Sequence, residues 1–124
     1  MRVLILEDDP VQLAPLEGVV RELFLEPVGV RSPDLALAGL ERAPVLAVVD
    51  LGMSLAPRGE HTVDEVLGGL YERCGGCCVL VYSVRADEIE TKAARRLRNW
   101  LDRVGSRVRL VDHGHRCYGL HLST

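Results

Sequence analysis

The sequence has no long apolar run, no excess of positive charge and few aromatic residues. No hydrophobic stretch approaches the roughly 20 residues of a membrane span, and no segment resembles a signal peptide. A net charge of -3 gives no overall attraction to nucleic acid. Aromatic residues make up 4% of the chain, and Trp100 is expected in the core rather than as a platform for bases. We therefore expect a cytoplasmic protein without direct contact to membrane or nucleic acid.

The chain has enough apolar sequence for one core. Of its 124 residues, 48% are hydrophobic and 27% are charged. One core can be buried by a chain of this length, whereas each half alone would be marginal. We therefore treat residues 1–124 as a single domain.

Strand and helix patterns alternate along the chain, which is typical of a parallel α/β sheet. Short apolar runs predict five strands, at residues 3–6, 28–30, 45–49, 77–82 and 108–111. Capping residues and helical spacing predict four helices, which begin near Pro10, Ser32, Thr62 and Asp87. Pro15 is expected to loosen the opening turn of the first helix. The tail from Asp112 to Thr124 lacks helical periodicity.

Carboxylates follow two of the predicted buried strands. Glu7, Asp8 and Asp9 come directly after the first strand, and Asp50 ends the third. Acidic residues also occur at ordinary helix starts, because anions are favoured at helix N-termini. Here, however, the carboxyl ends of parallel strands meet at one edge of the sheet, where open loops can form a site. Acids on two separate strands therefore favour a site for a cation or a phosphoryl group.

Three segments together resemble the receiver domains of two-component response regulators, the CheY-like family. They are Leu4-Ile5-Leu6-Glu7-Asp8-Asp9-Pro10, Val48-Val49-Asp50-Leu51 and Val79-Leu80-Val81-Tyr82-Ser83, and the resemblance covers roughly residues 1 to 111. It implies an α/β fold with a single doubly wound, five-stranded parallel sheet of the flavodoxin or CheY type. In this chain the last helix of that fold would be shortened or missing.

The resemblance also implies a site and its partners. Asp50 would be the phosphoacceptor, Ser83 would contact the phosphoryl group, and Mg²⁺ would be held by Glu7, Asp8, Asp50 and the carbonyl of Gly52. An aspartate can attack phosphorus when a metal neutralises its neighbours, so the chemistry is reasonable by itself. The implied partners are a histidine kinase or phosphotransfer protein, and a downstream protein or second copy bound through the fourth helix and fifth strand. Such a domain would be a phosphoacceptor switch and not an enzyme, with at most self-catalysed phosphoryl transfer.

Three departures from the family favour an alternative reading. The family has a lysine at the end of the fifth strand, but the only lysine here is Lys92, within the predicted fourth helix. Whether His113, Arg109 or Arg116 replaces it stays open. The loop after Asp50 has its proline and glycine off register, and the tail is short. The alternative is a degenerate pseudo-receiver that acts as a phosphorylation-independent interaction module.

Cysteine and histidine residues form two groups that also allow a zinc site. One group is Cys74, Cys77 and Cys78, and the other is His113, His115, Cys117 and His121. The predicted fold puts the two groups near opposite ends of the sheet, which argues against a shared ion. We expect Cys77 and Cys78 to be buried thiols and Cys74 to be exposed.

Overall fold

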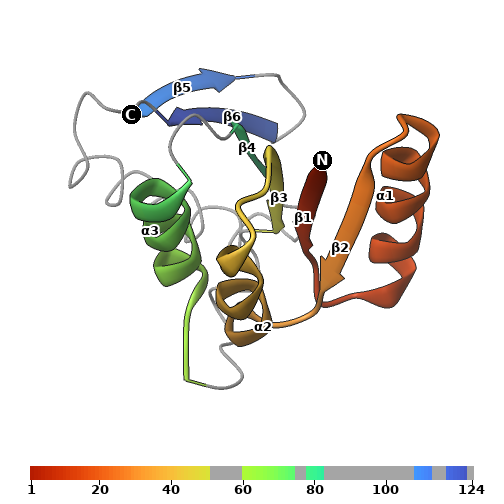
Figure 1. The fold of residues 1–124 in the computed structure, drawn as a ribbon, viewed down its shortest axis with the longest axis horizontal. Helices are drawn as coiled ribbons and strands as arrows, with labels where there is room; N and C mark the ends of the chain where they lie inside the picture. The colour runs from red at the N-terminus through yellow and green to blue at the C-terminus, as the bar shows by residue number, and fades with distance from the viewer. Residues whose placement is uncertain (51–59, 75–77, 83–107, 113–116, 123–124) are drawn as a thin grey trace.

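One mixed sheet organises the part of the chain that the computed structural model describes, which is residues 1–50, 60–74, 78–82, 108–112 and 117–122 (Figure 1). Its strand order is β2-β1-β3-β4-β6-β5. The strands are β1 (Arg2–Leu6), β2 (Glu26–Val30), β3 (Leu46–Asp50), β4 (Cys78–Tyr82), β5 (Val108–Asp112) and β6 (Cys117–Leu122). The helices in this part are α1 (Pro10–Glu22), α2 (Pro33–Ala38) and α3 (Val63–Arg73), with the 3-10 helix η1 (Gly39–Glu41). Strands β2, β1, β3 and β4 are parallel to one another.

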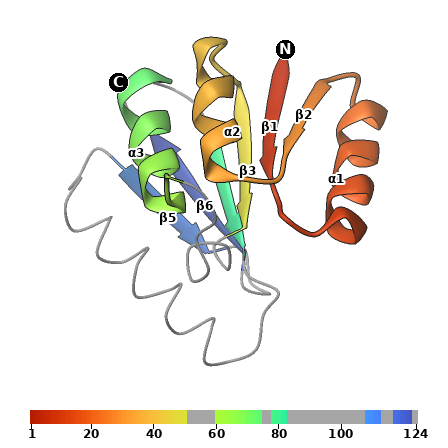
Figure 2. The ribbon, with the colours of Figure 1, turned by 90° about the horizontal axis from the view of Figure 1, so that it is seen from below.

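Helices lie on both faces of the sheet, with α1 on one face and α2 and α3 on the other (Figure 2). Along β1, Val3 and Ile5 pack against α1, while Leu4 and Leu6 face the larger core under α2 and α3. Successive side chains of a strand point to opposite faces. Both faces of β1 are therefore buried, which explains why its sequence is a continuous apolar run. The sequence prediction of a buried strand here is confirmed.

The helices begin at the predicted caps. Asp9, Ser32 and Thr62 are the N-cap residues, and their side chains accept hydrogen bonds from the backbone N–H groups of Val11, Leu35 and Glu65. These bonds satisfy donors that have no partner within the helix, and each is worth about 1 kcal/mol. The second helical segment ends before Pro44, as predicted.

Pro15 does not interrupt α1, which runs continuously from Pro10 to Glu22. The first turn is formed, because the carbonyl of Asp9 accepts from the N–H groups of Gln12 at 3.0 Å and Leu13 at 2.9 Å. Pro15 has no N–H for the carbonyl of Val11, but both residues are on the exposed side of the helix. Water can therefore bond to that carbonyl, and the expected loosening of the helix start is not needed.

The tail differs from the expected arrangement of five parallel strands. Strand β6 comes from the tail, lies between β4 and β5, and is antiparallel to both. Residues 117–122, Cys-Tyr-Gly-Leu-His-Leu, alternate in hydrophobicity with a period of two, which favours a strand over a helix. A hairpin partner for β5 was therefore present in the sequence. The predicted helix from Asp87 lies outside the described residues.

No helix in the described segments is both long enough and apolar enough to cross a membrane.

Candidate functional site

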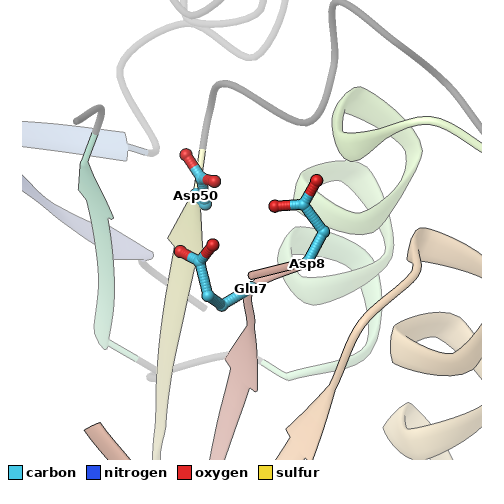
Figure 3. A group of neighbouring side chains, drawn as sticks. All are labelled: Glu7, Asp8 and Asp50. Atoms are coloured by element: carbon cyan, nitrogen blue, oxygen red, sulfur yellow. The ribbon is translucent and has the colours of Figure 1, made fainter. Parts of the chain in front are cut away.

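Three carboxylates meet at the edge of the sheet where β1 and β3 end (Figure 3). One carboxylate oxygen from each of Glu7, Asp8 and Asp50 lies within 4.8 Å of the other two. Glu7 and Asp50 are each only 1% exposed, and Asp8 is partly buried. The two acidic segments that sequence analysis expected at one edge are therefore brought together, and among the described residues this is the one cluster with the composition of a metal site.

Backbone bonds hold the acidic segment after β1 in place. The N–H of Glu7 donates to the carbonyl of Val30 at 3.1 Å, which extends the pairing of β1 with β2 by one residue. The carboxylate of Glu7 accepts from the N–H of Asp9 at 3.1 Å. Asp9 itself caps α1 through Val11 at 2.9 Å. Asp9 is thus an ordinary helix N-cap, as acidic residues at helix starts often are. Glu7 and Asp8 belong to the carboxylate cluster.

The three charges repel strongly at this spacing. Two unit charges 4.8 Å apart interact with about 3.5 kcal/mol at an effective dielectric constant of about 20. A cation bound among the three carboxylates would offset that repulsion. The oxygen atoms suit a hard divalent cation, and Mg²⁺ ligands at about 2.1 Å from the ion lie between about 3 and about 4 Å apart. A contraction of less than an ångström would bring the most distant oxygens into that range, so the donor set fits Mg²⁺.

Arg31 borders the site and was missed by sequence analysis. Its side chain is exposed, and its Nε donates to the carbonyl oxygen of Asp8 at 3.0 Å. A signal for it was present, because Arg31 directly follows β2 and the carboxyl ends of parallel strands share one edge. The structure therefore places a guanidinium beside the loop that carries the acidic residues.

Asp34, in the first turn of α2, binds the backbone of the segment that precedes α3. The carboxylate of Asp34 accepts from the N–H groups of Glu60 at 3.2 Å and His61 at 2.9 Å. The side chain of His61 also forms a hydrogen bond with Glu65, which raises the pKa of His61 above its ordinary value of 6.5. Residues next to the junction of β2 and α2 thus bond both to Asp8 and to the segment that precedes α3.

The strand register shows whether Arg109 can replace the lysine that the receiver family has at the end of its fifth strand. Asp50 pairs with Tyr82 at the carboxyl end of β4, and Tyr82 pairs with Cys117 of β6. Arg109 belongs to the row that contains Cys78, at the other end of β4 and about 13 Å away along the strands. Arg109 is therefore too far away to replace the lysine. The other predicted site residues, Gly52 and Ser83, and the alternatives His113 and Arg116 lie outside the described residues.

The cysteines differ from expectation in three respects. Cys78, which we expected to be buried, is only partly buried, and Cys77 lies outside the described residues. Cys74, which we expected to be exposed, is 3% exposed, because it continues the buried stripe of α3 into the core. His121 pairs with Cys78 in the β4–β6 register, so the two groups are not confined to opposite ends of the sheet. Cys74 packs with Val79, whereas Cys78 is the neighbour of Val79 along the strand and faces the other side. Burial also raises the pKa of the Cys74 thiol, so these two cysteines do not form a ready zinc site.

Comparisons with known proteins show a fold but no sequence family. No protein-family model matches the chain, and no curated protein matches its sequence. The structure is similar to the beryllofluoride-activated NtrC receiver domain, with a TM-score of 0.50 and 17% identity over 77% of this chain and 74% of that one. It is also similar to a putative rRNA methylase from Clostridium thermocellum, with a TM-score of 0.59 and 12% identity. That match covers 99% of this chain and 73% of the methylase chain.

A yeast Spc42 trimeric coiled coil fused to another structure has a TM-score of 0.60 and 12% identity over 79% of this chain. This chain spans 60% of the length of that one. At such identities the likeness concerns the fold alone. The α/β arrangement is compatible with that of a CheY-like receiver domain.

Proposed function

We propose that this protein is a receiver-like phosphoacceptor domain of a two-component phosphorelay, in which Asp50 accepts the phosphoryl group. The observation that carries the proposal is the meeting of Glu7, Asp8 and Asp50 within 4.8 Å at the carboxyl edge of a parallel sheet. Ligand sites of open α/β sheets form at that edge. A histidine kinase or phosphotransfer protein would supply the phosphoryl group.

In the proposed reaction, a carboxylate oxygen of Asp50 forms a bond to phosphorus while the bond from phosphorus to the donor atom breaks. The leaving group takes the electron pair, and the product is an acyl phosphate on Asp50. Glu7 and Asp8, with the carbonyl of Gly52, would hold Mg²⁺, which supplies charge neutralisation when bound. Ser83 would donate a hydrogen bond to the transferred group. Glu7 and Asp50 are each 1% exposed, and such burial would limit the access of water to the product.

The acidic composition of the loop after β1 disfavours a nucleotide-type cofactor in the same place. Such cofactors approach the first strand of an open α/β sheet at a glycine-rich turn. Here the turn is Glu7-Asp8-Asp9-Pro10 and contains no glycine. The likeness to an rRNA methylase therefore supports the fold and gives no reason to propose methyl transfer.

The alternative of a degenerate pseudo-receiver is favoured by one observation on the fold. Strand β6 lies between β4 and β5, so Asp112 at the end of β5 is one strand further from Asp50 than the expected parallel order would place it. A residue at the end of β5 is then badly placed to contact the phosphoryl group. On this reading the domain binds a partner protein or a second copy regardless of phosphorylation.

Intact mass after incubation with Mg²⁺ and acetyl phosphate tests the proposal. We expect an adduct of one phosphoryl group in the wild-type protein and none in Asp50→Asn. The adduct should also disappear when Mg²⁺ is removed by a chelator. A folded wild-type protein that forms no adduct would contradict the proposal. A partner complex whose affinity ignores the phosphodonor would then establish the pseudo-receiver.

A further inference from the structure

We propose that Arg31 binds the phosphoryl group of the incoming donor and so supplies the fixed positive charge at the rim of the acidic site. This inference rests on the proposed function and adds a substrate-binding residue to it. The observation behind it is the hydrogen bond from Arg31 Nε to the carbonyl oxygen of Asp8 at 3.0 Å. That bond fixes the end of an exposed side chain next to the loop that carries two of the three carboxylates.

A positive side chain at the rim of the site would favour the approach of an anionic phosphodonor to three carboxylates. Glu7, Asp8 and Asp50 carry three negative charges when ionised, and Mg²⁺ offsets two of them. A phosphodonor is itself an anion, so the carboxylates of the site repel it and a nearby guanidinium attracts it. In phosphoryl transfer, positive groups that contact the equatorial oxygens stabilise the transition state.

Arg31 is available for that role. Arginine has five N–H donors, and the bond to Asp8 uses one of them. In the segments that the structure describes, the arginines with carboxylate partners are Arg2 and Arg21, and Arg31 forms no ion pair there. Its remaining donors are on an exposed side chain and have the planar geometry that matches two phosphate oxygens.

The backbone around Arg31 keeps it in place. The preceding residue, Val30, accepts the N–H of Glu7 at 3.1 Å, and the following residue, Ser32, caps α2 through Leu35 at 3.2 Å. The arginine therefore sits between two fixed points, and a phosphate could be bound with little loss of backbone freedom.

The experiment compares Arg31→Ala and Arg31→Lys with the wild-type protein. The second-order rate constant for phosphorylation by acetyl phosphate is measured by intact mass at saturating Mg²⁺, and Mg²⁺ affinity is measured separately by amide chemical shifts. Arg21→Ala is the matched control, because Arg21 is an exposed arginine in the last turn of α1 that pairs with Glu17 at 3.6 Å.

We expect Arg31→Ala to lower the rate constant about tenfold, the loss of one charge-assisted hydrogen bond, and Arg31→Lys to recover part of it. Mg²⁺ affinity should change less than about twofold, and Arg21→Ala should behave as wild type. A purely structural role through Asp8 predicts instead that Mg²⁺ affinity falls together with the rate constant, and that result overturns the inference.

Two further outcomes separate this inference from the function on which it rests. If the wild-type protein forms an Asp50-dependent adduct and Arg31→Ala forms it within twofold of the same rate, Arg31 has no role in donor binding and only the inference fails. If the wild-type protein forms no adduct at all, the proposed function fails, and the inference fails with it.

Discussion

Replacing Asp50 by asparagine should stabilise the metal-free protein and remove its stabilisation by Mg²⁺. The substitution keeps the shape of the side chain but deletes one of three carboxylates that lie within 4.8 Å of one another. Asp50 is 1% exposed, so solvent does little to weaken its repulsion from Glu7 and Asp8. The wild-type protein should therefore gain stability from a divalent cation, and the variant should not.

The magnitude follows from the spacing of the carboxylates. Each of the two repulsions that involve Asp50 is about 3.5 kcal/mol at 4.8 Å and an effective dielectric constant of about 20. The partial exposure of Asp8 weakens the repulsion in which it takes part. We expect a net gain of about 1 to 3 kcal/mol in the free energy of unfolding without metal. For a chain of this size, each kcal/mol corresponds to a rise of about 4 °C in Tm.

The assay is urea unfolding in a chelator and again in excess Mg²⁺. Glu22→Gln is the control, because Glu22 is an exposed carboxylate at the far end of α1 from the site. The control should shift neither the metal-free stability nor the response to Mg²⁺ by more than about 0.5 kcal/mol. If Asp50→Asn is less stable than wild type in the chelator, the carboxylates do not repel one another as argued, and the case for a cation site is lost.

Three further predictions concern local structure. Phe24 has a φ of 60° and is 97% exposed, so Phe24→Gly should raise the free energy of unfolding by about 1 kcal/mol in urea titrations. Gly68→Ala adds a methyl group with no atom within 4 Å and should raise the free energy of unfolding by about 1 kcal/mol. Gly69→Ala should raise it less, because its methyl group would lie 2.9 Å from Leu40 of η1. Equal gains for the two variants would contradict this packing. The NMR titration midpoint of His61 should lie above 6.5 and return toward it in Glu65→Gln. Because the folded pKa is raised, the stabilisation by protonated His61 is present below the unfolded pKa and is lost as pH rises through the folded one.

The parallel part of the fold could be predicted because local signals and tertiary packing agree there. Apolar runs ending in Asp50 or leading to Glu7 mark strands buried on both faces, and Asp9, Ser32 and Thr62 are caps that act within one turn of their own helix. The acidic cluster could be predicted for the same reason, since parallel strands necessarily end at a common edge.

The order of the last strands could not be predicted, because strand pairing is a contact between distant segments. The tail carries a period-two pattern that is compatible with a strand, but nothing local states that Cys117 pairs with Tyr82 and not with the outer edge of the sheet. The burial of Cys74 was missed because its position in the stripe of α3 depends on how far that helix extends.

The caps, the buried strands and the acids at the ends of β1 and β3 follow from local sequence, since each depends on neighbouring residues. The long-range contacts set three other features: the deep burial of Glu7 and Asp50, the position of β6 between β4 and β5, and the contact of Arg31 with Asp8. Arg31 and Asp8 are separated by the whole of α1 and β2. Their contact depends on the crossover that brings β2 beside β1, which no local pattern encodes.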